Sequence, residues 1–523
     1  GTQNTAVGSL ALDANTTANN NAAVGYNALG SNTTGASNVA VGSIALDANT
    51  EGDNNTATGY DALGANTTGS NNTALGYEAL DTNSTGSNNT AVGAGALDGN
   101  TTANNNVAVG KHALLTNTTG TGHVAVGANA SDAITTNNYT TAIGFNALTA
   151  NTASNVVAVG AYALNANTSG DYNTSCGYSA LELNTTGDNN TAVGHKALEA
   201  NTTASNNTAL GYQALTDNST GTENVAVGAL ALDANTTGGE NTAIGYEALS
   251  AVTTNGGSTA VGRKALKDNT AGYNTAVGNG ALQVNTSGQR NVAVGALALD
   301  ANTTASDNTA LGYEALSANT TGYDNTAVGR DAMQNNTTGN NNAAFGCFAL
   351  EANTTAVDNT ACGYAAMVNN TEGFQNTALG SNSLRTNTTG DNNVAVGYGA
   401  LYSQTTANNN TAVGRDALND NTTGTENVAV GAYTLDASTT ANSNVAVGYN
   451  AMGANTTGAQ NVAIGAQCLP ANTTASNNVA VGNESMQNNT SGEYNTAVGS
   501  LALRANTTAD GNTAVGYNAM TAN

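Results

Sequence analysis

The sequence predicts an all-β fold, a parallel β-solenoid in which one short coil follows another along a rod. The first observation is a period: the glycine of residues 4–8, Asn-Thr-Ala-Val-Gly, recurs 31 times up to Gly516, with a spacing of 17. The spacing falls to 16 only at residues 144–160 and 262–278. A short period over a whole chain is typical of a solenoid and not of a globular enzyme. We therefore treat residues 1–523 as one uninterrupted array of repeats.

The second observation is the content of each repeat. If the Asn of the pentad is position one, the consensus is Asn, Thr/Val, Ala, Val, Gly, often Tyr, any residue, Ala, Leu, two variable residues, Asn, Thr, Thr, Gly/Ala and two polar residues. Two short apolar runs bounded by Gly, Asn and Thr predict two short strands and two turns per coil. Glycine at positions five and fifteen weakens any helical alternative by roughly 1 kcal/mol each.

Strand geometry gives the orientation and the length that we expect. Side chains alternate across a strand, so we expect valine at position four to face inward and alanine at position three to face the other way. Each strand pairs with its equivalent in the coils above and below. With coils about 4.8 Å apart, the whole array predicts a rod of roughly 150 Å.

Asparagine at position twelve has two structural explanations. It recurs in 27 of the 31 repeats, and its amide can form a hydrogen-bonded ladder along the rod or satisfy the backbone of a local turn. The replacements are Ile134, Val252, Gln404 and Ser438. The two 16-residue repeats lack one threonine of the following loop, which predicts that this loop lies on the outside.

An apolar residue on both faces of a strand predicts that both faces are covered. Position three is alanine in every repeat except at Ser175. We expect a second chain to approach over this alanine column, which favours an oligomeric rod over a single chain.

Composition excludes several classes of function. The formal charge is −25, but only 9% of residues are charged, and ten Lys and Arg form no basic stripe that would bind nucleic acid. No apolar run reaches the roughly 18–20 residues of a membrane helix, and no signal peptide is present, so we expect no membrane insertion. The chain starts and stops inside the repeat pattern, which favours a segment of a longer protein.

The reactive side chains follow no catalytic or metal-binding pattern. The cysteines are Cys176, Cys347, Cys362 and Cys468, and we interpret all four as packing residues, three of them in core columns. The histidines are His112, His123 and His195, at three unrelated repeat positions. No nucleophile, base and orienting acid recur together, and the loop has Thr-Thr where a calcium-binding roll has Asp. We therefore expect no catalytic residue, no metal and no cofactor.

Tyrosine is the residue type with most functional potential. Eleven of the 19 tyrosines occupy position six. We interpret the column as a partly exposed aromatic ladder; the alternative is a surface that stacks on sugars or binds another surface.

The pentads Asn-Val-Ala-Val-Gly at residues 106–110 and 444–448, and Asn-Val-Ala-Ile-Gly at residues 461–465, resemble the repeat of YadA-like adhesin heads. Similar arrays occur in phage tail fibres. The resemblance implies a left-handed parallel β-roll, three chains side by side and binding to surfaces. Those heads use a somewhat shorter repeat without the Asn-Thr-Thr-Gly loop, and no stalk, neck or anchor is seen here.

These observations lead to a structural hypothesis: the shaft or head of an extracellular adhesive fibre on a cell or virion surface, with itself, a cell surface or a glycan as partner. One alternative is a filament that assembles end to end. Another is binding of ice or glycans, although Thr16 and Thr17 are adjacent in a loop and not spaced as Thr-x-Thr on a strand.

Overall fold

The computed structural model describes residues 1–520 and divides into two compact units, Gly1–Ser258 and Thr259–Asn523. The strands of unit 1 are β1 (Thr5–Val7), β2 (Ala22–Val24), β3 (Val39–Val41), β4 (Thr56–Thr58), β5 (Thr73–Leu75), β6 (Thr90–Val92), β7 (Val107–Val109), β8 (Val124–Val126), β9 (Thr141–Ile143), β10 (Val157–Val159), β11 (Thr174–Cys176), β12 (Thr191–Val193), β13 (Thr208–Leu210), β14 (Val225–Val227) and β15 (Thr242–Ile244).

The strands of unit 2 are β16 (Thr259–Val261), β17 (Thr275–Val277), β18 (Val292–Val294), β19 (Thr309–Leu311), β20 (Thr326–Val328), β21 (Ala343–Phe345), β22 (Thr360–Cys362), β23 (Thr377–Leu379), β24 (Val394–Val396), β25 (Thr411–Val413), β26 (Val428–Val430), β27 (Val445–Val447), β28 (Val462–Ile464), β29 (Val479–Val481), β30 (Thr496–Val498) and β31 (Thr513–Val515).

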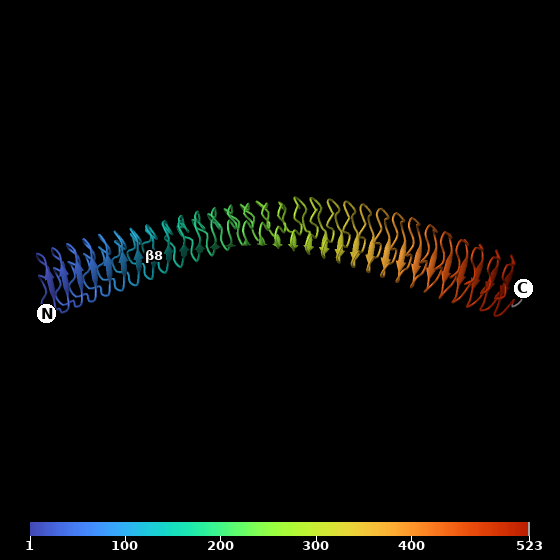
Figure 1. Ribbon diagram of the computed structural model, residues 1–523, viewed down its shortest axis with the longest axis horizontal. Coiled ribbons are helices and arrows are strands. Elements are labelled where there is room, and N and C mark those ends of the chain that lie inside the picture. The colour runs from blue at the N-terminus through green and yellow to red at the C-terminus, as the bar shows by residue number, and fades with distance from the viewer. Residues whose placement is uncertain (521–523) are drawn as a thin grey trace. The chain divides into compact units, whose positions relative to one another are not determined.

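Within each unit, consecutive strands pair in parallel with the equivalent strand of the next coil, in exact repeat register. In β7 and β8, for example, Ala108 lies opposite Ala125. Figure 1 shows the strands of each unit stacked one above the next, with loops closing every coil; unit 1 runs from blue to green and unit 2 continues to red. The predicted parallel β-solenoid with coils of about 17 residues is therefore confirmed.

Each coil has one strand and not the two that we predicted. The second apolar run, Ala-Leu at positions eight and nine, lies in a turn, and its leucine is left-handed, with φ of 53° at Leu29 and 54° at Leu46. That conformation costs an L-residue roughly 1–2 kcal/mol. Full burial of a leucine side chain contributes about 1.5–3 kcal/mol, which offsets the cost. An apolar dipeptide of this length does not distinguish a buried turn from a strand.

The glycine at position five ends the strand for two reasons. Gly42 has a φ of 143°, which side chains disfavour, and a Cβ built on it would lie 2.1 Å from the carbonyl oxygen of Gly59 in the next coil. The backbones of adjacent coils approach too closely here for any side chain. This explains why the glycine sets the period of the sequence.

The predicted inward face of the strand is wrong. Ala23 and Ala40 at position three are 0% exposed, whereas Val24 and Val41 at position four are each 39% exposed. The interior of the coil is too thin for valine there. The hydroxyl of Ser175, at position three, donates to the carbonyl of Ala180 at position eight of the same coil, at 2.7 Å. The alanine columns therefore line the core, and they are not available as contacts between chains.

Asparagine at position twelve adopts both of the arrangements that we considered. The Asn49 amide donates to Asn32 Oδ1 of the preceding coil at 2.8 Å and to the Gly52 carbonyl of its own turn at 3.0 Å. Position one forms a second ladder that we did not predict: Asn38 Nδ2 also donates to Gly52 O at 2.8 Å, and Asn38 N donates to Asn21 Oδ1 at 2.8 Å. Both columns are buried.

Threonine at position thirteen joins the loops of successive coils. Both the backbone N–H and the hydroxyl of Thr33 donate to the Thr50 carbonyl, at 3.1 and 3.0 Å. The next threonine, Thr34, is exposed. The loop thus lies on the outside of the coil, as the length variation predicted.

Candidate functional site

The most distinctive surface of the molecule is the solvent side of the strands. We define the outer sheet face as the side chains of positions two and four. Position two is Thr, Val or Ala in all 31 repeats, and position four is Val, Leu, Ile, Thr, Cys or Phe. Large members stay open to solvent, including Leu75 at 48%, Leu311 at 47% and Phe345 at 43% exposure. The position-four column is therefore largely apolar along the length of each unit, and position two adds threonine in 18 of the 31 repeats.

The size of this face sets it apart from ordinary surface. The 15 strands of unit 1, about 4.8 Å apart, make a face roughly 70 Å long and, with two columns of side chains, on the order of 10 Å wide. That is on the order of 700 Å² for one unit. The largest apolar patch on a typical monomer is about 300–600 Å², and a stable interface buries about 800 Å² per partner. The face is thus of interface size.

The charged residues lie around the outer sheet face and not within it. All 35 Asp and Glu residues occupy positions seven, ten, eleven, fourteen, sixteen and seventeen, and none lies at position two, four or six. Position six, which follows the strand and its glycine, has four basic residues, Lys111, Arg263, Arg330 and Arg415. In a chain with a net charge of −25, the outer sheet face is an uncharged band beside a column of aromatic, small and basic residues.

The predicted tyrosine column at position six is exposed and partly stacked. Tyr60 and Tyr77 stack with ring centroids 5.4 Å apart and an interplanar angle of 13°. Tyr178, His195 and Tyr212 form a continuous stack with centroids 5.4 Å apart at each step. Stacked rings cover one another's faces and leave their edges to solvent. These stacks favour the structural interpretation over stacking on sugars, which needs an open ring face.

The four cysteines are free thiols, but only one lies in the core. Cys468 is buried, Cys347 is half-buried, and Cys176 and Cys362 are exposed. The prediction of three core cysteines was wrong because position four faces outward. Cys176 in unit 1 and Cys362 in unit 2 therefore lie within the outer sheet face.

The three histidines lie apart from one another, as their unrelated repeat positions predicted. His123 replaces the buried asparagine at position one; its Nδ1 lies 2.7 Å from Thr140 Oγ1 and its Nε2 lies 2.8 Å from Asn137 O. Burial lowers the pKa of His123 to about 4. Within residues 1–520 no three His, Cys, Asp or Glu side chains are arranged to hold a metal ion.

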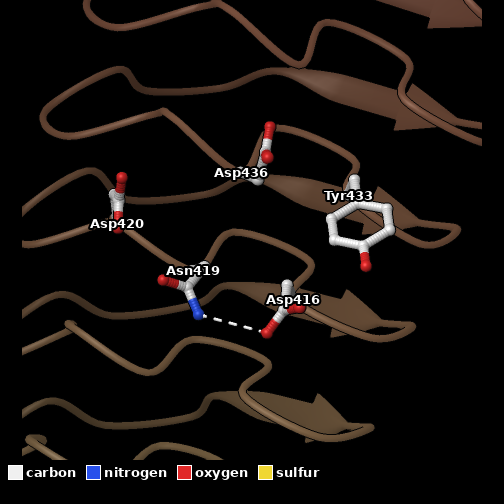
Figure 2. A pocket seen from close by; sticks show the side chains of 5 residues that line it. All are labelled: Asp416, Asn419, Asp420, Tyr433 and Asp436. Carbon is white, nitrogen blue, oxygen red and sulfur yellow. Dashed lines mark hydrogen bonds between the residues drawn. The ribbon is translucent and has the colours of Figure 1, made fainter.

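A second feature is an acidic hollow in unit 2 of about 240 Å³ (Figure 2). Asp416, Asn419, Asp420, Tyr433 and Asp436 line it, and they come from the turns of two successive coils. Asn419 Nδ2 donates to Asp416 Oδ1 at 3.5 Å. Burial raises the pKa of the Asp436 carboxyl, and the nearby Asp420 and Asp416 raise it further. Sequence analysis did not predict this hollow, because its residues come from variable positions.

Comparison with protein-family models finds no match, and comparison with curated protein sequences finds none. The part of the chain that the structure describes has no helix with the length and hydropathy of a membrane span.

Proposed function

We propose that this chain is the rigid shaft or head of an extracellular fibre, on a cell or virion surface, and that copies of it assemble through the outer sheet face. The observation that carries the proposal is that face: an exposed, uncharged, apolar band of interface size on a strongly acidic chain. Self-association removes the band from water without burying any charge.

The composition of the face also favours a permanent contact. Most of its residues are Val, Ile or Thr, whose branched side chains are already restricted at χ1. They therefore lose less rotamer entropy on burial than long side chains do. The face runs along each unit, so chains that meet through it lie side by side. We propose a homotrimer around a common axis, the arrangement that the resemblance implies; its mechanism is mechanical, with no catalytic residue.

The ladders support the mechanical part of the proposal. Each buried asparagine of position twelve bridges its own turn and a neighbouring coil, as Asn49 does, and the position-one and position-thirteen ladders run beside it. A coil is thus held at its strand and at its loop. Stability in such arrays accumulates over neighbouring repeats, which suits an extended shaft.

Two native thiols test the proposal directly. We expect Cys176 and Cys362 to resist labelling by a maleimide in the assembled native protein and to react rapidly after denaturation. Cys347, beside the face at position six, reports on its rim, and Cys468 is the control for a thiol protected by the core, where burial raises its pKa to about 12. Rapid native labelling of both Cys176 and Cys362 would show that the face is uncovered and would reject the assembly.

Ice binding is a second candidate because position two is threonine in 18 repeats and faces outward on a regular sheet. This differs from the loop threonines that the sequence analysis considered. Large side chains such as Leu75 and Phe345 interrupt the flatness of the face, so we place this function second. Thermal hysteresis of the purified protein tests it: no hysteresis at high protein concentration removes ice binding.

A further inference from the structure

Three hydrogen-bond ladders join the loop sides of successive coils. At position twelve, side-chain amides link consecutive asparagines, as Asn83 Nδ2 does to Asn66 Oδ1 at 2.8 Å. At position one, a backbone N–H donates to the preceding asparagine side chain, as Asn89 N does to Asn72 Oδ1 at 2.9 Å. At position thirteen, a backbone N–H and a hydroxyl donate together to the next coil. The strand ladder is a fourth, separate connection.

The position-thirteen link is missing at one level inside unit 1. Thr118 donates its N–H to Thr135 O at 2.9 Å and its hydroxyl at 3.0 Å. Thr152 makes the equivalent bonds to Thr168, at 2.8 and 2.6 Å. Thr135 is the position-thirteen residue between Thr118 and Thr152. Among the described residues, its N–H and its hydroxyl have no protein partner, and the N–H of Thr136 has none either. Every other position thirteen followed by a coil of its own unit keeps both bonds.

The position-twelve ladder stops at the same level. Ile134 stands where the ladder has asparagine and is 0% exposed. It has no amide to donate, and Asn117 Oδ1 below it is a buried acceptor with no partner. The position-one ladder continues here, because Thr140 N donates to His123 Nδ1 at 3.3 Å; it is interrupted one coil later, where Val156 has no side-chain acceptor. An unsatisfied buried acceptor is one of the more costly features of a protein interior.

The sequence explains why the interruption occurs here. The repeat that contains Thr152 is one of the two with 16 residues, and it lacks one residue of the loop. The shortened loop places the Thr152 carbonyl beyond the reach of Thr135. The strands are not affected, because β9 pairs in full register with β8 and with β10. The coils therefore stay joined at the strand and on both sides of the gap, where Ala133 N donates to Thr149 O at 3.2 Å and Asn138 N donates to Ser154 Oγ at 3.3 Å. The loop link is missing only at Thr135 and Thr136.

We propose that residues 134–137 are the point at which unit 1 opens first and at which a protease can cleave the folded chain. Thr135 and Thr136 are both exposed, and cleavage requires backbone that is accessible and unpaired. The inference is independent of the proposed assembly, since it concerns contacts between coils of one chain. It gives an otherwise uniform array one defined point at which adjacent coils separate and the chain can be cleaved.

Limited proteolysis of the full chain with a protease of broad specificity, followed by mass spectrometry of the fragments, tests this. We expect the earliest cuts within residues 134–137. The decisive variant combines Ile134→Asn with one threonine inserted after Thr152, which restores the repeat length and the ladder. It is expected to slow cleavage at 134–137 by roughly tenfold or more, since at least two hydrogen bonds are regained.

Hydrogen exchange gives a second readout that does not depend on protease specificity. The amides of Thr135 and Thr136 should exchange at least about tenfold faster than those of Thr67 and Thr68, which donate to Ser84 O at 2.9 and 3.3 Å in an intact stretch. Equal protection of the two pairs, or first cuts spread evenly over the loops of other coils, would overturn the proposal. So would a restored variant that is cleaved at 134–137 as fast as the wild type.

Discussion

Replacing Asn49 by alanine tests the position-twelve ladder at a point where it is fully formed. The side chain makes three hydrogen bonds: it donates to Asn32 Oδ1 at 2.8 Å and to Gly52 O at 3.0 Å, and it accepts from Asn66 Nδ2 at 2.9 Å. All three asparagines are 0% exposed. Each bond contributes about 1 kcal/mol, so Asn49→Ala should destabilise the surrounding coils by roughly 3 kcal/mol, with Asn32 Oδ1 left without its partner.

Hydrogen exchange measured by mass spectrometry is the assay for this variant, because a long array does not unfold in a single step. A loss of about 3 kcal/mol predicts exchange faster by roughly 100-fold in the coils around residue 49, falling back to the wild-type rate a few coils away. Thr34→Ala is the matched control, since Thr34 is exposed at position fourteen of the preceding coil, its side chain belongs to neither ladder and its backbone is not left-handed. The reasoning is refuted if Asn49→Ala and Thr34→Ala change the protection of these coils equally.

Four further substitutions test other parts of the structure by the same assay. Ala40→Val adds volume to the thin core and should lower local stability by about 1–3 kcal/mol, whereas Val41→Ala on the outer face should leave local stability within about 0.5 kcal/mol of wild type; the reverse order contradicts the assigned faces. Gly42→Ala should abolish local protection around β3 and β4, because its Cβ meets the Gly59 carbonyl; wild-type protection contradicts the close approach. His123 has a pKa lowered from 6.5 to about 4, so its coil should be fully stable above pH 6.5 and lose roughly 3 kcal/mol as the pH falls towards 4; persistence of this loss in His123→Asn would assign it to other groups.

The sequence predicts the fold class well because the period and the apolar columns survive in every repeat. Parallel pairing of successive coils and an asparagine ladder both follow from residues that recur every 17 positions. The wrong details share one physical cause. Positions three and four are both apolar, so alternation alone gives no sign of which faces inward, and the answer depends on the thickness of the coil. Only the depth of the core decides that alanine fits and valine does not.

Other features depend on backbone conformations that the residue types do not indicate. Leu29 and Leu46 are left-handed, which is rare for leucine, and nothing in the apolar pair Ala-Leu indicates it. The outer sheet face follows from the orientation of position four, and the prediction placed the contact between chains on the alanine column instead. The proposed opening point at residues 134–137 corresponds to two separate irregularities of the sequence, Ile134 and a short repeat. Only the hydrogen bonds show that both irregularities remove loop contacts between the same two coils.

The measurement that tests the central claim most directly is the native mass by sedimentation equilibrium, for the wild type and for a variant with charge on the outer sheet face. The variant is Val294→Asp with Leu311→Asp, two solvent-facing residues of position four in adjacent coils; Thr304→Asp, at an exposed loop position, is the control. The account predicts three times 51.4 kDa for the wild type and the control, and a shift towards the single-chain mass for the variant. A wild-type mass of 51.4 kDa would contradict assembly through this face.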